Sequence, residues 1–293
     1  MKRLDLNHEE AMLCSGHAAC PGCIDALSVR HVLATLGPDT MAVVPPSCMA
    51  IIAGPQPYSS LKIPVYQPTL EASAAAASGL RRALDAQGKR DTTVVVLAGD
   101  GGTYDIGFQC LSSAAERNED FIYVCLDNEG YMNTGAQKSS STPHYAWTGS
   151  TPAGKTSRKK NLTEIMAAHG VPYVATASAG HLADLKRKVA KAKSMRGTRI
   201  LTLLIPCLDG WGLRDDAGLT AARLAVESGA FPLYEVEDGR RYSVNSDKTR
   251  PVADYLAIQR RYRHMTPAQV DALQAEIDDG WAMLQRRAAL AAA

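Results

Sequence analysis

The pattern of apolar and polar positions predicts an alternation of strands and helices along most of the chain. Short runs of apolar, often β-branched residues predict strands at residues 41–44, 93–98, 121–126, 173–176 and 200–205. Between them, residues 24–36, 72–84, 108–117, 162–169 and 183–192 have helical spacing and many residues that favour helices. Such alternation is typical of a parallel sheet with crossover helices on both faces. We therefore expect an α/β fold, doubly wound around a mostly parallel sheet.

Two segments break this alternation. Residues 133–160 are rich in Ser, Thr, Gly and Pro, have no clear periodicity and end in the basic run Arg158, Lys159 and Lys160. A loop of this length inside a compact domain is usually functional. After Cys207 the chain becomes polar and irregular, and a helical pattern returns at residues 267–290. We expect a main domain at residues 1–235 and a partly helical C-terminal extension at residues 236–293.

Composition narrows the possible functions. The 293 residues include 46% hydrophobic side chains, enough for a full core, and 32 basic against 30 acidic side chains leave a formal charge of +2. This balance gives no general attraction to nucleic acid or to an anionic membrane. No apolar run approaches the roughly 20 residues of a membrane span, and residues 1–10 are charged, unlike a secretion signal. We expect a cytoplasmic protein with no membrane span and no nucleic-acid partner.

A glycine-rich turn follows the strand predicted at residues 93–98. It reads Gly-Asp-Gly-Gly at residues 99–102, and such glycines let a backbone approach a phosphate closely. The next strand ends just before Asn128, so Asp100 and Asn128 lie at the carboxyl ends of strands expected to be neighbours, where parallel sheets bind ligands. Carboxylate and amide oxygens suit Mg²⁺. In the structural alternative, Asp100 caps a helix while Asn128 and Gly130 shape a turn.

The seven cysteines predict metal ligation, catalysis or burial, because an odd number without an export signal argues against a disulfide framework. Cys20 and Cys23 form a Cys-x-x-Cys that opens a helix. Cys48 follows a Pro-Pro-Ser turn, and Cys207 lies just past the end of a strand. Four thiolates from these loops can bind either zinc or a [4Fe–4S] cluster. Structural zinc sites more often combine two close pairs, so one pair with two solitary cysteines favours a cluster.

The remaining three cysteines are assigned individually. Cys125 lies inside an apolar strand and Cys110 on the flank of a helix, so both are expected in the core. Cys14 is close enough in sequence to the Cys-x-x-Cys to be a rival fourth ligand.

Four motifs together resemble the β subunit of pyruvate:ferredoxin oxidoreductases, within the 2-oxoacid:ferredoxin oxidoreductase family. They are the Gly-His-x-x-Cys-x-x-Cys start, the Pro-Pro-Ser-Cys turn, the Gly-Asp-Gly-Gly-Thr-Tyr-Asp-Ile-Gly segment and Tyr-Met-Asn-Thr-Gly at residues 131–135. The resemblance covers nearly all of the chain up to about residue 240. It implies a thiamine diphosphate-binding fold with a C-terminal extension.

The resemblance also assigns roles to single residues. It implies that Asp100 and Asn128 ligate Mg²⁺ through their side chains and Gly130 through its carbonyl, and that Asn133 reaches the substrate. The loop onward through Lys155 would pack over the active site. The residues expected around the cofactor are Gly99, Asp100, Gly101, Gly102, Asn128, Gly130, Tyr131, Met132 and Asn133. Those expected to hold the [4Fe–4S] cluster are Cys20, Cys23, Cys48 and Cys207.

The implied reaction is the oxidative decarboxylation of a 2-oxo acid, with pyruvate as the first choice, to CO₂ and an acyl-coenzyme A. Electrons would pass singly through the cluster to ferredoxin. Thiamine enzymes need a glutamate on the aminopyrimidine ring, and no residue of this chain is an evident candidate. The resemblance implies that an α-type subunit supplies it, within an assembly that also contains a γ-type and a ferredoxin-like δ-type subunit. The chain alone should be inactive.

Three departures from the family pattern leave the substrate open. Ile24 follows the Cys-x-x-Cys where relatives usually carry glycine, and residues 208–209 read Leu-Asp where a prolyl stretch often follows the last cysteine. The loop at residues 144–147 is also bulkier than usual, with His144, Tyr145 and Trp147. If these rings line the cavity, they could stack on an aromatic 2-oxo acid such as phenylglyoxylate. Otherwise they would pack against the partner subunit.

The sequence is also compatible with another substrate and with two other functions. Oxalate is another candidate substrate. A non-oxidative thiamine diphosphate decarboxylase or carboligase would keep the magnesium site and carry zinc or no metal at the cysteines. A non-catalytic electron-transfer or scaffold subunit is a further alternative, against which the intact Asp100, Asn128 and Asn133 argue.

Overall fold

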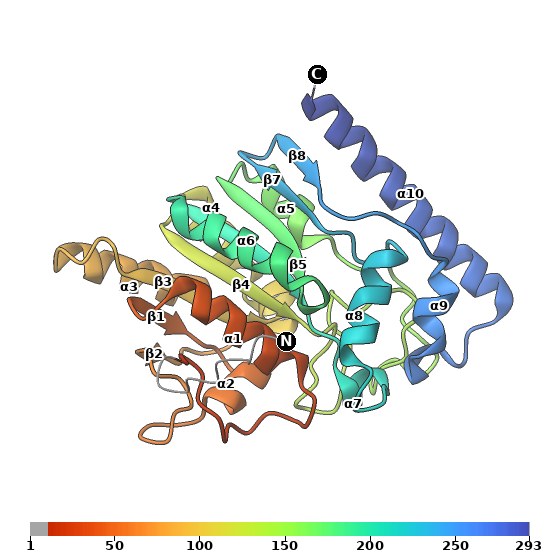
Figure 1. Ribbon diagram of the computed structural model, residues 1–293, viewed down its shortest axis with the longest axis horizontal. Coiled ribbons are helices and arrows are strands. Elements are labelled where there is room, and N and C mark those ends of the chain that lie inside the picture. Colours follow the sequence, from red (N-terminus) through yellow and green to blue (C-terminus); the bar gives the residue numbers. More distant parts are fainter. Residues whose placement is uncertain (1–10, 293) are drawn as a thin grey trace, which may run out of the picture.

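The computed structural model describes residues 11–292 (Figure 1). Residues 1–10, on which the prediction of no secretion signal depended, lie outside the described residues. The described part forms one eight-stranded sheet in the order β2-β1-β3-β4-β6-β5-β7-β8. Its strands are β1 (Thr40–Val43), β2 (Val65–Tyr66), β3 (Thr93–Gly99), β4 (Phe121–Asp127), β5 (Tyr173–Ser178), β6 (Thr198–Leu204), β7 (Tyr234–Glu237) and β8 (Arg241–Val244). The pairings from β2 to β5 are parallel, whereas β7 and β8 continue the sheet in antiparallel fashion.

Helices cover both faces of this sheet. One face packs against α1 (Ile24–Leu36), α2 (Cys48–Ala53) and α6 (Leu182–Ser194), and the other against α3 (Ser73–Ala86), α4 (Phe108–Glu116) and α5 (Leu162–Ala168). Successive residues of a strand point to opposite faces. In β3, Val95 and Leu97 therefore join the first core cluster, and Val94 and Val96 join the second. Burial on both faces explains why the central strands are apolar at nearly every position.

The doubly wound α/β fold is confirmed, and so are the five strands and five crossover helices predicted from the pattern, each with ends within two residues of the expected ones. The short or polar elements were not predicted. These are β2, the β7–β8 hairpin, α2, α7 (Leu208–Trp211), α8 (Gly218–Glu227) and α9 (Val252–Ala257). Such segments are too short to display a period or lie half exposed, so their pattern of apolar residues is weak.

The C-terminal part extends the sheet and then packs beside it. The helix predicted at residues 267–290 is α10 (Pro267–Ala292), which contacts β8 and α9 and runs along one side of the molecule (Figure 1). The predicted boundary after residue 235 falls inside β7, so the division into two parts stays a prediction. Although α10 has 26 residues, no helix within residues 11–292 is both long and apolar enough to cross a membrane.

Candidate cofactor and metal site

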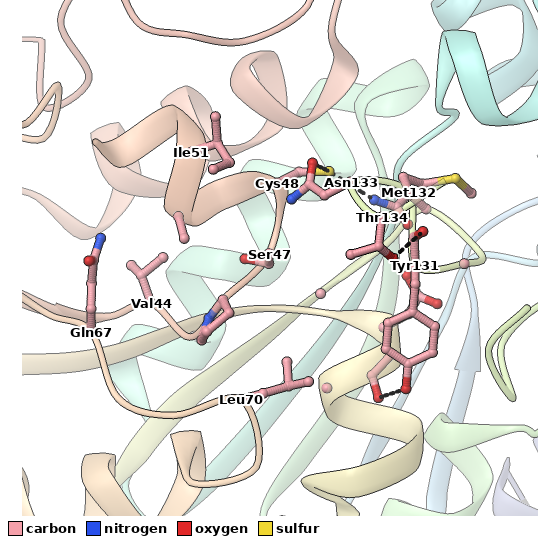
Figure 2. A pocket seen from close by; sticks show the side chains of 18 of the residues that line it. Val44, Ser47, Cys48, Ile51, Gln67, Leu70, Tyr131, Met132, Asn133 and Thr134 are labelled. Carbon is pink, nitrogen blue, oxygen red and sulfur yellow. Dashed lines mark hydrogen bonds between the residues drawn. The ribbon is translucent and has the colours of Figure 1, made fainter. Parts of the chain in front are cut away.

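A cavity of about 500 Å³ opens where β1, β3 and β4 end (Figure 2). Val44 and Ile51 lie on one side of it and Tyr131 lies on the other, and Cys48 and Asn133 lie next to each other (Figure 2). All nine residues that the sequence predicted around a cofactor line this cavity, although they come from two separate loops. The two loops meet because β3 and β4 are adjacent parallel strands, so their carboxyl ends lie at the same edge of the sheet.

The loop after β3 continues into a short π-helix at Gly101–Ile106, a rare element that is frequent at functional sites. Asp100 stands at its N-cap position, but its side chain makes no capping hydrogen bond, so the interpretation of Asp100 as a helix cap is wrong. The glycine at position 101 has a clear steric cause. A Cβ atom there would lie 2.2 Å from the ring of Tyr131, whose hydroxyl is 3.0 Å from both the Gly101 carbonyl and Asp105 Oδ2.

Three oxygen-bearing groups converge in the cavity. One terminal atom of the Asn128 amide lies 2.9 Å from Asp100 Oδ1 and 2.8 Å from the Gly130 carbonyl oxygen. If this atom is the amide nitrogen, it donates a hydrogen bond to both oxygens. If it is the amide oxygen, three acceptor oxygens, from Asp100, Asn128 and Gly130, face one another. Adjacent ligands of an octahedral Mg²⁺, each about 2.0–2.1 Å from the ion, lie about 2.9 Å apart. The oxygen orientation therefore fits a bound Mg²⁺, and it turns the Asn128 nitrogen toward Cys48 Sγ, 3.7 Å away.

The charges around the cavity are those expected of a cation-binding site. Asp100, Asp127 and Glu129 are all buried. Lys159 Nζ lies 2.8 Å from a carboxylate oxygen of both Asp127 and Glu129, and Arg261 lies 2.7 Å from Glu129. Within residues 11–292, Asp100 has no cationic side chain paired with it. Burial, reinforced by the charge of Asp127, raises the pKa of Asp100 well above its usual range. A cation bound to these three oxygens would neutralise the buried Asp100 carboxylate and stabilise its charged form.

The Asp127–Gly130 turn is held by contacts that the sequence analysis did not anticipate. The indole Nε1 of Trp211 donates to the Asn128 carbonyl at 2.8 Å, and Thr142 Oγ1 donates to the Glu129 carbonyl at 2.7 Å. Lys159 and Arg261 bind the side chains of the same turn. The sequence signal for these contacts was the pair Asp127 and Glu129, which flank the predicted metal ligand Asn128. Carboxylates buried at a strand end require cationic side chains nearby.

The four predicted cluster ligands lie at starts of helices or in the loop before one. Cys23 is the N-cap of α1, Cys48 the first residue of α2 and Cys207 the N-cap of α7, where Cys207 Sγ accepts from the Gly210 N–H at 3.3 Å. Burial, followed by the charges of Asp25 and the other three cysteines, raises the pKa of Cys48 to about 12. No three His, Cys, Asp or Glu side chains of residues 11–292 form a group that could hold a metal ion. The ligand assignment stays a prediction.

Cys14, Cys110 and Cys125 are the three cysteines that were not predicted to bind the cluster. Cys125 is fully buried in β4, so its core prediction is confirmed. Cys110 is only half-buried and packs against the edge of the core from α4. The backbone N–H of Cys14 donates to the Ser60 carbonyl at 2.8 Å. Cys14 does not line the surface depression around Cys20 and Cys23.

The aromatic residues of the long loop do not line the cofactor cavity. The rings of His144 and Tyr145 stack with centroids 3.7 Å apart, and His144 Nδ1 pairs with Glu276 of α10 at 3.1 Å. Trp147 is 42% exposed. The cavity of this chain therefore offers no support for stacking of these rings on an aromatic substrate, and His144 instead contacts the C-terminal helix through Glu276.

Comparisons with known proteins agree with this site. Residues 48–203 match the family described as "Thiamine pyrophosphate enzyme, C-terminal TPP binding domain". "Pyruvate synthase subunit PorB" of Methanothermobacter thermautotrophicus is 46% identical, and the alignment covers 92% of this chain and 96% of that relative. The chain belongs to the 2-oxoacid:ferredoxin oxidoreductases, as their thiamine diphosphate-binding subunit.

Other proteins similar to this chain differ in the substrate that their names give. "Ketoisovalerate oxidoreductase subunit VorB" of Pyrococcus abyssi is 41% identical, over 98% of this chain and 96% of that relative. The "NADH-dependent phenylglyoxylate dehydrogenase subunit beta" of Aromatoleum evansii is 40% identical, over 94% of this chain and 64% of that relative. The solved 2-oxoglutarate:ferredoxin oxidoreductase from Magnetococcus marinus has the same fold, with a TM-score of 0.59, 22% identity, and coverage of 76% of this chain and 82% of that one.

Proposed function

We propose that this subunit binds thiamine diphosphate with Mg²⁺ and one [4Fe–4S] cluster, in an assembly that converts pyruvate and coenzyme A to acetyl-coenzyme A and CO₂. Each turnover releases two electrons, which pass to ferredoxin. The observation that best supports this function is the convergence of the Asp100, Asn128 and Gly130 oxygens in a cavity that Cys48 also lines. A metal-diphosphate site and a potential iron ligand thus share one wall.

Within this site, the residues have distinct roles. Asp100, Asn128 and Gly130 would hold the Mg²⁺, which would bind the cofactor's diphosphate. When bound, thiamine diphosphate supplies the carbon nucleophile and the electron sink for decarboxylation. Asn133 projects beside the cavity, with its Oδ1 3.3 Å from Cys48 Sγ, and would hydrogen-bond the 2-oxo acid (Figure 2).

The cysteines would connect the cofactor to the electron acceptor. Because Cys48 lines the cofactor cavity, a cluster held by Cys20, Cys23, Cys48 and Cys207 would adjoin that cavity and could accept electrons from the cofactor. The N–H groups at helix starts favour nearby negative charge, which suits thiolates bound to iron. The raised pKa values of Cys23, about 11, and Cys48, about 12, both caused mainly by burial, imply that metal binding must release protons from these thiols.

Pyruvate is supported by two observations. The pyruvate synthase subunit is 46% identical to this chain, against 41% and 40% for the ketoisovalerate and phenylglyoxylate relatives. Asn133 lies in the Tyr-Met-Asn-Thr-Gly segment that resembles the pyruvate enzymes. The rest of the substrate pocket, and the glutamate for the aminopyrimidine ring, would come from an α-type subunit. A γ-type and a ferredoxin-like δ-type subunit would complete this cytoplasmic assembly.

The test is an anaerobic assay of the whole complex with coenzyme A and a viologen dye as electron acceptor. Pyruvate, 2-oxoisovalerate, 2-oxoglutarate, oxalate and phenylglyoxylate are compared as substrates. We expect the highest kcat/KM with pyruvate and no turnover by the chain alone. Faster turnover of phenylglyoxylate or oxalate would contradict the substrate, and decarboxylation without dye reduction would indicate a non-oxidative enzyme instead.

A further inference from the structure

The long loop at residues 133–160 ends in a lysine that reaches back to the metal-ligand turn. Lys159 Nζ lies 2.8 Å from Asp127 Oδ2 and 2.8 Å from Glu129 Oε1. These two residues flank Asn128 on either side. A single ammonium group thus joins the residue before the predicted magnesium ligand to the residue after it.

This turn has a conformation that needs support. Glu129 has a φ of +67°, in the left-handed region that is uncommon for residues other than glycine. Two buried carboxylates two residues apart would also repel each other without a cation between them. Arg261 neutralises Glu129 from the far side, with its Nη2 2.7 Å from Glu129 Oε2, but it is not paired with Asp127. Among the side chains of residues 11–292, Lys159 is the one whose ion pairs link the two carboxylates.

We propose that Lys159 is a positioning residue of the metal site, which holds Asp127 and Glu129 together so that the Asn128 amide and the Gly130 carbonyl face Asp100. The inference rests on the proposed magnesium site. It gives the long loop a specific task, since the loop supplies the cation that a buried turn with two carboxylates requires. Lys159 itself touches neither Asp100 nor Asn128 in the hydrogen bonds of this structure, so it acts through the turn.

The adjacent lysine provides a matched control. Lys160 Nζ donates to the Tyr104 carbonyl and lies 5.2 Å from the centre of the Phe108 ring, with no ion pair to Asp127 or Glu129. Substitution of either lysine by methionine removes one charge from the same segment. Only the change at Lys159 disconnects the two carboxylates.

The experiment measures thiamine diphosphate binding to the purified complex, stripped of cofactor, as Mg²⁺ is added back. Partners that orient metal ligands typically change metal affinity by about 10–100-fold, so Lys159→Met should raise the half-saturating Mg²⁺ concentration by at least about tenfold. Lys159→Arg, which keeps two donors in the same place, should remain within about threefold of wild type. Lys160→Met should bind Mg²⁺ as wild type does.

A double variant separates positioning from charge balance. In Lys159→Met with Asp127→Asn, the unpaired carboxylate is gone, so the chain folds even if the single variant does not. Weak Mg²⁺ binding in this double variant supports the positioning role. Wild-type binding in either Lys159→Met or the double variant overturns it. If the wild-type complex itself binds thiamine diphosphate without any need for Mg²⁺, the proposed function fails instead, and the two failures are distinguishable.

Discussion

The substitution Trp211→Phe should destabilise the protein, mainly through the loss of one buried hydrogen bond. Trp211 is fully buried, and its indole Nε1 donates to the Asn128 carbonyl at 2.8 Å. Phenylalanine keeps an aromatic ring against Tyr255, whose ring centre lies 6.4 Å away, but it has no N–H to donate. The carbonyl of a predicted magnesium ligand would then be buried without this partner.

The size of the effect follows from two contacts. A buried carbonyl that loses its donor costs about 1–3 kcal/mol. The guanidinium of Arg261 lies 3.8 Å from the Trp211 ring centre, and its weaker attraction to a smaller ring costs about 0.5–1 kcal/mol more. Together these give about 1.5–4 kcal/mol, and at about 2 °C per kcal/mol for a chain of this size the melting temperature should fall by about 3–8 °C.

Thermal unfolding of the anaerobic complex, followed by fluorescence, measures this change with and without Mg²⁺ and thiamine diphosphate. The added ligands should raise the melting temperature less in Trp211→Phe than in wild type, because the released turn binds Mg²⁺ more weakly. The matched control is Trp147→Phe, since Trp147 is 42% exposed and should shift stability by less than about 0.5 kcal/mol. Equal shifts in the two variants would refute the role assigned to the indole hydrogen bond.

Three further predictions concern separate groups. Asp100→Ala should abolish retention of thiamine diphosphate, because it would remove the charged ligand that we propose for Mg²⁺; undiminished affinity in equilibrium dialysis would contradict the site. Cys207→Ser should remove iron and acid-labile sulfide from the chain, whereas Cys110→Ser on α4 should not; equal loss in both would contradict the ligand assignment, and zinc without iron in wild type would replace the cluster. Burial lowers the pKa of Lys155 from 10.5 to about 8, so the folded chain binds this proton less tightly than the unfolded chain. The stability of wild type relative to Lys155→Met should therefore rise as the pH increases from 8 to 10.5 in urea titrations, and a constant difference would argue against it.

Much of the fold was predictable from local patterns. The central strands and crossover helices carry long apolar runs or clear helical periods, because burial on one or both faces selects residue types position by position. The β7–β8 hairpin was missed because β8 alternates between exposed and half-buried positions, with Arg241 exposed at its start. Helix α2 was missed because it contains only six residues, too few to show a period.

In the candidate site, too, residues in local motifs were predictable and their distant partners were not. Asp100 and Asn128 could be predicted as neighbouring site residues because a glycine-rich turn and a strand end are local features of the sequence. Lys159 and Arg261 neutralise the same turn, but the sequence analysis did not assign them to it. They lie 32 and 134 residues after Asp127 in the chain. No periodic pattern links residues at such separations.

The sequence by itself determined the α/β fold, the two loops of the cofactor site and the family, because each depends on residue type and spacing within short segments. Only the tertiary structure decided which partners those residues meet. It brought the Asn128 amide within 2.9 Å of Asp100, and it directed His144 to Glu276 rather than to the cavity. The physical reason is that contacts between distant segments depend on how irregular loops fold back on the sheet. In such loops, burial and charge compensation among several side chains choose the conformation, and the local sequence does not encode that choice.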